Sequence, residues 1–324
     1  MNDCVDRTIR PLVSVVCLTY NQADYIEECL ISLISQKTTF SYEIIVHDDC
    51  SLDGTREIVE RYVRQYPNLI VPIFEEENQY SKGVSIQSII APFISGKYVA
   101  ICEGDDYWID ENKLQIQCSY LEQNRECSLA VHQSYGFDSG KQKVVKTITD
   151  CSVERHYMFD EVVLGGGGLF STNSMCFPSE YYLLPESFRN WGVGDIPRLL
   201  FLASKGYIWY SDKAMSVYRL AAEGSWTLRV NSSIDSLNSM RKKIISGYEK
   251  LLALDEFKDN NAIIRMVRFN KIKLYAVEGK WFEIANSDVK EEFDLRPLKW
   301  RMAIYLIAHF PVLFRCYLKI RYRQ

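Results

Sequence analysis

Three carboxylates follow directly on a short apolar run of the chain. Residues 98–102 are rich in β-forming side chains, and Glu103, Asp105 and Asp106 come next, with Gly104 allowing the backbone to turn. Carboxylates this close repel one another, so they stay ionised together only when a cation or several donors offset the charge. Oxygen ligands of this kind suit Mg²⁺ or Mn²⁺. The stretch predicts a divalent-cation site at a strand end, and the alternative is a solvated acidic turn before the next helix.

The residues upstream of this stretch predict alternating strands and helices. Short apolar runs indicate buried strands, and apolar residues at helical spacing indicate helices between them. The predicted strands are residues 11–19, 42–47 and 69–74, and the predicted helices are residues 24–34, 58–66 and 84–95. Such alternation favours an α/β fold with a Rossmann-like, mostly parallel sheet, in which ligands bind outside the carboxyl ends of the strands. The polar clusters at residues 19–21, 48–55 and 103–106 all lie at those ends.

The second half of the chain has a less regular pattern. It predicts a helix at 113–124, strands at 129–137 and 207–219, and mainly helices from 232 to 287. We therefore expect a catalytic domain over residues 1–228, a helical extension over 229–294 and a separate tail over 295–324. Asp195 precedes an apolar helical pattern, so it is either a helix cap or a general base.

Composition and cysteine spacing limit the class of protein. The chain has 324 residues and a formal net charge of −4, which gives no reason to expect a nucleic-acid partner. None of the ten cysteines lies within four positions of another, so the CxxC spacing of zinc ribbons is absent. Residues 1–10 lack the apolar core of a secretory signal. We expect free thiols and a cytoplasmic protein.

The C-terminal tail differs from the rest of the chain in charge. Residues 295–324 contain seven Lys or Arg residues and no acid, and residues 300–314 are mostly apolar. This segment is too short to span a bilayer. It favours a helix lying in the headgroup region of an anionic membrane, with a terminal helix docked on the protein as the alternative.

The motifs taken together resemble those of inverting family 2 glycosyltransferases with the GT-A fold, of the type found in bacterial polysaccharide synthesis. The matching segments are residues 13–22, residues 48–55, residues 103–108, the pair Gly194-Asp195 and residues 217–219. The resemblance implies transfer of a sugar from a nucleotide-diphosphate donor, with UDP favoured, to an acceptor hydroxyl with inversion. A divalent cation, Mg²⁺ or Mn²⁺, would be the cofactor. The acceptor would be a glycan or a lipid-linked molecule, reached from the inner face of the cell membrane.

The same resemblance implies roles for individual residues. The residues implied to contact the nucleotide sugar are Thr19, Tyr20, Asn21, Asp49, Lys82 and Asp105. Asp105 and Asp106 resemble the ribose and metal ligands of a DxD-type motif, in which Glu103 replaces the usual first Asp. Asp195 resembles the catalytic base. Relatives often carry a His shortly after the Tyr-Arg pair, whereas residues 220–222 here are Leu-Ala-Ala.

Three tryptophans near these motifs are candidate contacts of the acceptor. Trp108, Trp191 and Trp226 could stack on sugar rings, although each is more often a core or rim residue. Two other classes of protein stay open from the sequence. A nucleotidyltransferase or another Mg²⁺–nucleotide enzyme could use the same carboxylates, but no glycine-rich phosphate loop is present. A non-catalytic relic that binds a nucleotide sugar is the second alternative.

Overall fold

The computed structural model of the chain describes residues 10–149, 151–189, 191, 193–220 and 233–312. The chain divides into two compact units. The first comprises residues 1–159, 167–184 and 202–222, and the second comprises residues 160–166, 185–201 and 223–324. The predicted domain boundary at residue 228 lies outside the described residues.

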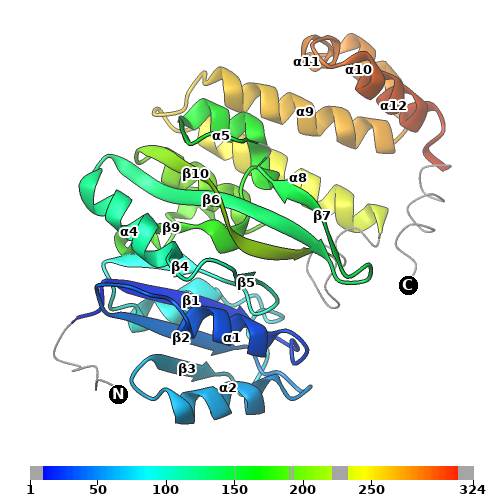
Figure 1. The fold of residues 1–324 in the computed structure, drawn as a ribbon. Helices are drawn as coiled ribbons and strands as arrows, with labels where there is room; N and C mark the ends of the chain where they lie inside the picture. The colour runs from blue at the N-terminus through cyan, green and yellow to red at the C-terminus, as the bar shows by residue number, and fades with distance from the viewer. Residues whose placement is uncertain (1–9, 150, 190, 192, 221–232, 313–324) are drawn as a thin grey trace. The chain divides into compact units, whose positions relative to one another are not determined.

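A four-stranded parallel layer forms one half of the sheet in the first unit (Figure 1). Its strands run in the order β3-β2-β1-β4 and lie at the predicted places. They are β1 (Val13–Thr19), β2 (Tyr42–Asp48), β3 (Ile70–Phe74) and β4 (Tyr98–Ile101). All are paired in parallel, with Val13 opposite both Tyr42 and Tyr98. Their carboxyl ends therefore meet at one edge, as the sequence predicted.

Amphipathic helices connect these strands. They are α1 (Ile26–Ile34), α2 (Thr55–Gln65) and α3 (Ile86–Ile90), and a further helix, α4 (Lys113–Gln123), follows the layer in the chain. The apolar stripe of α1, including Ile26, Leu30 and Leu33, is fully buried in the same hydrophobic cluster as β1 and β2. α3 is shorter than predicted because a 3-10 turn, Ala91–Phe93, with Pro92 in it, follows directly.

The other half of the sheet mixes strand directions. Its strands are β5 (Tyr107–Trp108), β6 (Cys127–Asp138), β7 (Lys143–Ile148), β8 (Arg155–Tyr157), β9 (Cys176–Pro178) and β10 (Tyr207–Leu220). β9 pairs antiparallel with β4 and with β6, so it joins the two halves. β6 and β10 are parallel, and β5 returns antiparallel against β10. The short β5, β8 and β9 were not predicted because two or three residues show no periodicity.

The predicted C-terminal helices make up most of the second unit. They are α8 (Ile234–Leu252), α9 (Asn261–Val277), α10 (Trp281–Asn286), α11 (Lys290–Asp294) and α12 (Leu298–His309). α8 and α9 begin at Ser233 and Asn260, whose side chains accept hydrogen bonds from backbone N–H groups at 3.0 and 2.9 Å. Two further helices, α5 (Phe159–Gly165) and α6 (Asp195–Ala203), contribute residues to both units.

Candidate active site

The loops after β1 and β2 are fastened together at the carboxyl edge of the sheet. Asn21, at the left-handed φ of 51°, donates its backbone N–H to Ser51 Oγ at 2.8 Å. Its Oδ1 accepts the backbone N–H of Leu52, also at 2.8 Å. One residue on, the backbone N–H of Gln22 donates to Thr55 Oγ1 at 2.8 Å. Asn21 is thus placed to order a loop, and Tyr20 beside it is exposed.

Asp49 connects the segments that follow β1, β2 and β3. Its backbone N–H donates to the carbonyl of Thr19 at 3.1 Å. Its carboxylate accepts the backbone N–H groups of Gln79 and Tyr80, beyond β3, at 2.7 and 3.1 Å. The side chain is only 5% exposed, so it is held in one orientation. A carboxylate has about four lone-pair sites, so Asp49 retains capacity for a ligand N–H group.

Gly104 allows the loop after β4 to approach β1 closely. A Cβ atom added there would lie 2.5 Å from Gln22 Oε1 and 2.9 Å from Thr19 Cβ, which real Cβ atoms do not tolerate. Its backbone N–H donates to the carbonyl of Leu18 at 2.8 Å. Thr19 therefore lies between Asp49 on one side and the carboxylate loop on the other. The structure thereby brings together the loops of the first three predicted motifs.

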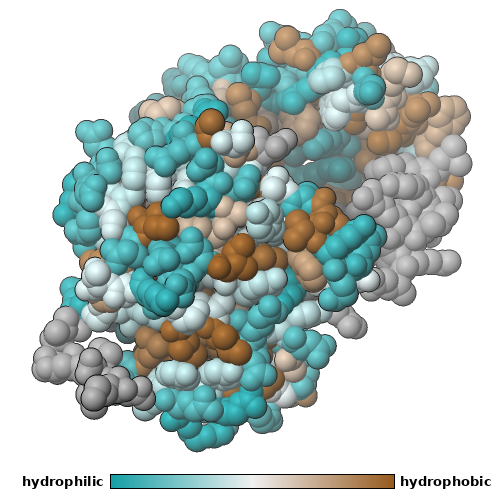
Figure 2. All heavy atoms as spheres, in the orientation of Figure 1, coloured by the Kyte–Doolittle hydropathy of each residue, from teal (hydrophilic) through white to brown (hydrophobic). Residues whose placement is uncertain are grey.

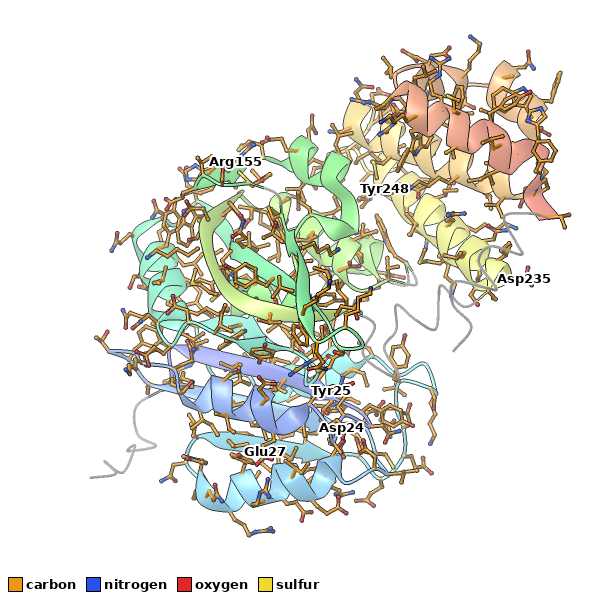
Figure 3. The ribbon with its side chains drawn as sticks, turned by 45° about the vertical axis from the view of Figure 1, so that its right-hand side comes forward. Asp24, Tyr25, Glu27, Arg155, Asp235 and Tyr248 are labelled. Atoms are coloured by element: carbon orange, nitrogen blue, oxygen red, sulfur yellow. The ribbon has the colours of Figure 1, made fainter. Side chains whose placement is uncertain are left out.

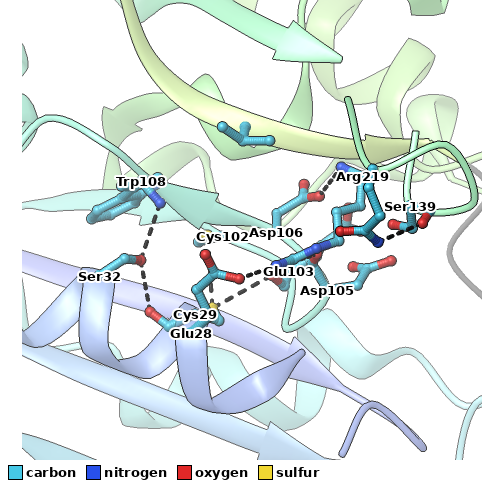
Figure 4. A network of polar contacts seen from close by, with 12 residues as sticks. Glu28, Cys29, Ser32, Cys102, Glu103, Asp105, Asp106, Trp108, Ser139 and Arg219 are labelled. Atoms are coloured by element: carbon cyan, nitrogen blue, oxygen red, sulfur yellow. Dashed lines mark hydrogen bonds and ion pairs between the residues drawn. The ribbon is translucent and has the colours of Figure 1, made fainter. Parts of the chain in front are cut away.

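Asp106 is enclosed by the protein. It is fully buried, and both carboxylate oxygens accept hydrogen bonds at 2.9 Å. Oδ1 accepts the backbone N–H of Arg219 (Figure 4), and Oδ2 accepts Asn173 Nδ2. Asn173 is fixed in turn, since its Oδ1 accepts the hydroxyl of Ser216 at 2.8 Å and its Nδ2 also donates to the carbonyl of Val217. Because Asp106 is fully buried, a metal ion bound directly to it would have to lie within the protein interior.

Arg219, at the end of β10, holds the carboxylate loop against α1. Its guanidinium donates to the backbone carbonyl of Asp105 and forms an ion pair with Glu28 (Figure 4). The rings of Tyr25 and Tyr107 flank it, with centroids 5.0 and 4.7 Å from its Cζ atom. Tyr25 stands at the start of α1 (Figure 3). Sequence analysis included the Tyr-Arg pair in a motif but gave Arg219 no role.

The charges of this loop are unbalanced. Burial raises the pKa of Asp106 well above its usual range, and the charges of Asp105 and Glu103 raise it further. Burial also raises the pKa of Asp105, against the opposing charge of Arg219. A bound cation would favour the ionised form of both groups.

The oxygen atoms around Asp105 fit a small hard cation shared with a phosphate. Mg²⁺ is usually held by one or two carboxylates together with substrate oxygens. Asp105 offers such a carboxylate, and at the same turn the buried Thr19 Oγ1 and Gln22 Oε1 have no hydrogen-bond partner among the described residues. Among the described residues, no group of three or more His, Cys, Asp or Glu side chains could hold a metal ion without further ligands.

Lys82 and two of the tryptophans are engaged in protein contacts. Lys82 forms an ion pair with Glu77. Trp108 is 4% exposed and donates its Nε1–H to the carbonyl of Asn173 at 3.0 Å. Trp191 is 1% exposed and packs edge-on against Tyr248, with ring centroids 5.2 Å apart. Both tryptophans are thus core residues, the alternative considered for them, and Trp226 lies outside the described residues.

Asp195 belongs to the second unit, where it is the first residue of α6, as predicted. Its Oδ1 accepts the backbone N–H of Ile196 at 2.9 Å, and burial raises its pKa. Burial and the nearby charge of Asp195 both raise the pKa of Tyr248, which comes from α8 (Figure 3). A carboxylate with a raised pKa is a better proton acceptor at neutral pH than an exposed one.

A cavity of about 560 Å³ lies elsewhere in the first unit. It opens at the other end of β1 and β4, with Leu12, Lys97 and Tyr98 in its wall. None of the predicted site residues lines it. The carboxyl edge of the sheet is the better candidate because the polar loops and the raised pKa values occur there.

Comparison with known proteins identifies the family. The profile described as Glycosyl transferase family 2 matches residues 14–178. The putative teichuronic acid biosynthesis glycosyltransferase TuaG of Bacillus subtilis is 35% identical over 121 residues, which cover 37% of this chain and 46% of TuaG. The chain matches less than half the length of these curated relatives: 46% of TuaG and 34% of the protein Rv1520 from Mycobacterium tuberculosis, which is 37% identical over 123 residues.

Solved structures share the fold over nearly the whole chain. The Staphylococcus aureus protein TarS 1-349 in complex with UDP-GlcNAc superposes with a TM-score of 0.63 at 17% identity, covering 96% of this chain and 91% of that one. The mannosyltransferase PcManGT of Pyrobaculum calidifontis, in complex with GDP-Man and Mn²⁺, gives 0.56 at 18% identity, covering 97% and 86%. At these identities the likeness concerns the fold, and it confirms the predicted GT-A type.

Proposed function

We propose that this chain, which belongs to glycosyl transferase family 2, transfers a sugar from a nucleotide-diphosphate donor to an acceptor hydroxyl with inversion. One observation carries the proposal. The loops after β1, β2 and β4 converge on Thr19, with Asp49 hydrogen-bonded to it and Gly104 in close approach. This edge presents a fixed carboxylate, which suits a nucleotide base, and a second carboxylate, Asp105, which could hold a cation for the diphosphate.

The donor base would bind at Asp49. Its carboxylate is already oriented by two backbone N–H groups, so an incoming N–H of a uracil ring would meet a prearranged acceptor. Thr19, Tyr20 and Asn21 would form the adjoining wall, with the exposed Tyr20 ring free to pack on the base. Lys82 would first have to leave Glu77 in order to face the nucleotide.

A divalent ion, Mg²⁺ or Mn²⁺, would be held by Asp105 together with the donor's diphosphate oxygens. When bound, it would neutralise charge on the departing diphosphate. Asp106 was also predicted as a ligand. Its side chain is fully buried and both oxygens accept hydrogen bonds from the protein, so we assign it chiefly to fixing the loop that presents Asp105.

The acceptor proton would pass to Asp195. The acceptor oxygen forms a bond to the anomeric carbon while the bond from that carbon to the diphosphate oxygen breaks, and the hydroxyl proton moves to a carboxylate oxygen of Asp195. A single displacement of this kind inverts the anomeric centre. The raised pKa of Asp195 suits this residue to the transfer, since a general base works best when its pKa approaches the working pH.

The acceptor would be a glycan or a lipid-linked molecule of surface polysaccharide assembly, met at the cytoplasmic face of a membrane. The name of TuaG supports a role in surface polysaccharide assembly, because it places that relative in teichuronic acid biosynthesis. No helix of the described residues combines the length and apolar character needed to cross a bilayer. We propose a peripheral contact with the membrane.

A thermal-shift panel tests the proposal directly. UDP, GDP and dTDP sugars, and NTPs as the control for a nucleotidyltransferase, would be added with and without Mn²⁺. A ligand that binds only the folded state raises the apparent stability by about 2.7 kcal/mol at a hundredfold excess over its Kd. We expect a UDP-sugar with Mn²⁺ to give the largest shift, and slow release of free UDP without acceptor. A response to NTPs alone, or no release of UDP by a chain that binds the donor, would contradict a transferase.

A further inference from the structure

Helix α12 packs against the second unit through one face only. Ile304 and Ala308 are buried, at 5% and 3% exposure, in a cluster that includes Ile272 of α9 and Ile284 of α10. Trp281 meets the ring of Tyr305 edge-on, with centroids 4.9 Å apart. The helix ends at His309, before Pro311. α12 is therefore part of the helical core, and its inner face is accounted for.

The opposite face of α12 is apolar as well. Leu298, Met302, Leu306 and Phe310 follow one another at four-residue spacing, and they are exposed by 70, 57, 54 and 54%. Residues four apart lie on one side of a helix, so these four form a continuous outer stripe. Figure 2 shows apolar residues on the surface of the C-terminal helices, at the upper right. A surface helix normally turns polar residues to water on this side, and a helix apolar all round needs a second apolar neighbour.

The sequence from residue 295 onward contains basic residues and no acidic ones. Lys299 lies within α12 and is exposed. Arg301 is paired with Asp294 at 3.0 Å, but residues 295–324 contain no acid to offset the other basic residues. Arg315, Lys319, Arg321 and Arg323 follow the stripe in the sequence, outside the described residues. Apolar surface bordered by positive charge matches the boundary between lipid headgroups and acyl chains.

We propose that the outer stripe of α12 docks on an anionic lipid surface, with the helix lying in the headgroup layer. The apolar side chains would enter the acyl boundary, and the basic residues would be attracted to anionic lipid. A second copy of the chain is the less suitable occupant. A two-fold contact through the same stripe would bring Lys299 of both copies onto one apolar face, and residues 295–324 contain no acid to oppose their charge.

Vesicle sedimentation of the full-length chain tests this inference. The protein would be mixed with phosphatidylcholine vesicles and with vesicles containing about 30% phosphatidylglycerol, at low and high salt. We expect most of the protein to sediment with the anionic vesicles, and the bound fraction to fall several-fold in 0.5 M NaCl because salt screens the attraction. No sedimentation with anionic vesicles at low salt would overturn the proposal.

A paired variant separates the stripe from general surface effects. Met302→Glu with Leu306→Glu should abolish sedimentation. The control, Val144→Glu with Val145→Glu, places two acids on β7 side chains of similar exposure, 51 and 43%, and should leave it unchanged. Deletion of α12 is unsuitable because it would remove Ile304 and Ala308 from the core. Equal sedimentation of the two double variants would refute the role of the stripe.

Two further measurements complete the test. Thermal melts of both variants should match the wild type, which shows that the outer face is not needed for folding. Light scattering should give the same mass for the wild type and for Met302→Glu with Leu306→Glu. A larger mass for the wild type that this variant abolishes would show a second copy as the occupant instead. None of these assays uses a nucleotide sugar, so their outcome is independent of the donor-binding test.

Discussion

Asn173 Nδ2 donates a hydrogen bond of 2.9 Å to Asp106 Oδ2, although 67 positions separate the two residues. Both side chains are fully buried. Burial of a carboxylate is unfavourable unless donors satisfy its oxygens, and here Asn173 and the Arg219 N–H group do so. The pair connects the carboxylate loop after β4 to the segment before β9, and it thereby fixes the orientation of that loop.

Asn173→Ala should destabilise the protein by about 1–3 kcal/mol, because it leaves one oxygen of a buried carboxylate without its donor. Chemical denaturation of the wild type and the variant measures the difference. Asn286→Ala is a matched control, since Asn286 Nδ2 also donates to a carbonyl, that of Phe282 at 3.0 Å, but is exposed. We expect that change to stay within about 0.5 kcal/mol. Equal losses in the two variants would show that the buried pair has no special weight.

Gly104→Ala should distort the turn between β4 and the carboxylates. The new methyl group would lie 2.9 Å from Thr19 Cβ, so either β1 or the loop must move, at a cost of about 1–3 kcal/mol. We expect a lower melting temperature and weaker binding of UDP. Gly168→Ala is the control, because no atom lies within 4 Å of a Cβ added there. If the two variants melt and bind alike, the close approach at Thr19 is not required.

Asp105→Asn should remove the dependence of donor binding on the metal. The amide keeps the shape of the side chain but is a far weaker ligand for a hard cation. Calorimetry with UDP in the presence of Mn²⁺ should show affinity at least tenfold weaker, about 1.4 kcal/mol, and no further change when EDTA is added. Asp138→Asn, which changes a partly exposed carboxylate paired with Lys141, is the control. Retention of wild-type, EDTA-sensitive affinity by Asp105→Asn would exclude Asp105 as the ligand.

The sequence was sufficient to predict the parallel half of the sheet and the loops at its carboxyl edge. Strands such as β1 are continuous apolar runs, and the polar clusters begin where the runs stop, so local pattern and tertiary position agree. The same reasoning placed Asp49, Asp105 and Asp195 at element ends.

The partners of those residues could not be predicted. Asn173 and Arg219 reach Asp106 across 67 and 113 positions, and no local pattern specifies which strand end meets which. The hints for Arg219 were its place in the matching segment 217–219 and at the end of an apolar strand, and neither indicates what it contacts. Burial of Trp108 and Trp191 was open for the same reason, because a tryptophan's spacing shows which face of an element it occupies but not what covers that face.

Asp195→Asn should lower kcat by about 10²–10⁴ while UDP affinity stays within about twofold, because the amide cannot accept the acceptor's proton. The wild-type rate should rise with pH through a pKa above the ordinary 3.8, since only the ionised carboxylate acts as base. The variant's residual rate should lack this rise. Steady-state kinetics from pH 4 to 8 measures both.

Stability provides an independent readout of the same pKa. Because burial raises the pKa of Asp195 in the folded state, that state binds the proton more tightly than the unfolded chain does. Ionisation of Asp195 therefore lowers stability as pH rises through the folded pKa, and Asn at this position escapes the effect. We expect the melting temperature of Asp195→Asn, relative to the wild type, to be higher at pH 8 than at pH 4. If the difference in melting temperature between variant and wild type is the same at both pH values, and the pH–rate profile is unchanged, then burial does not raise the pKa of Asp195 and Asp195 is not the base.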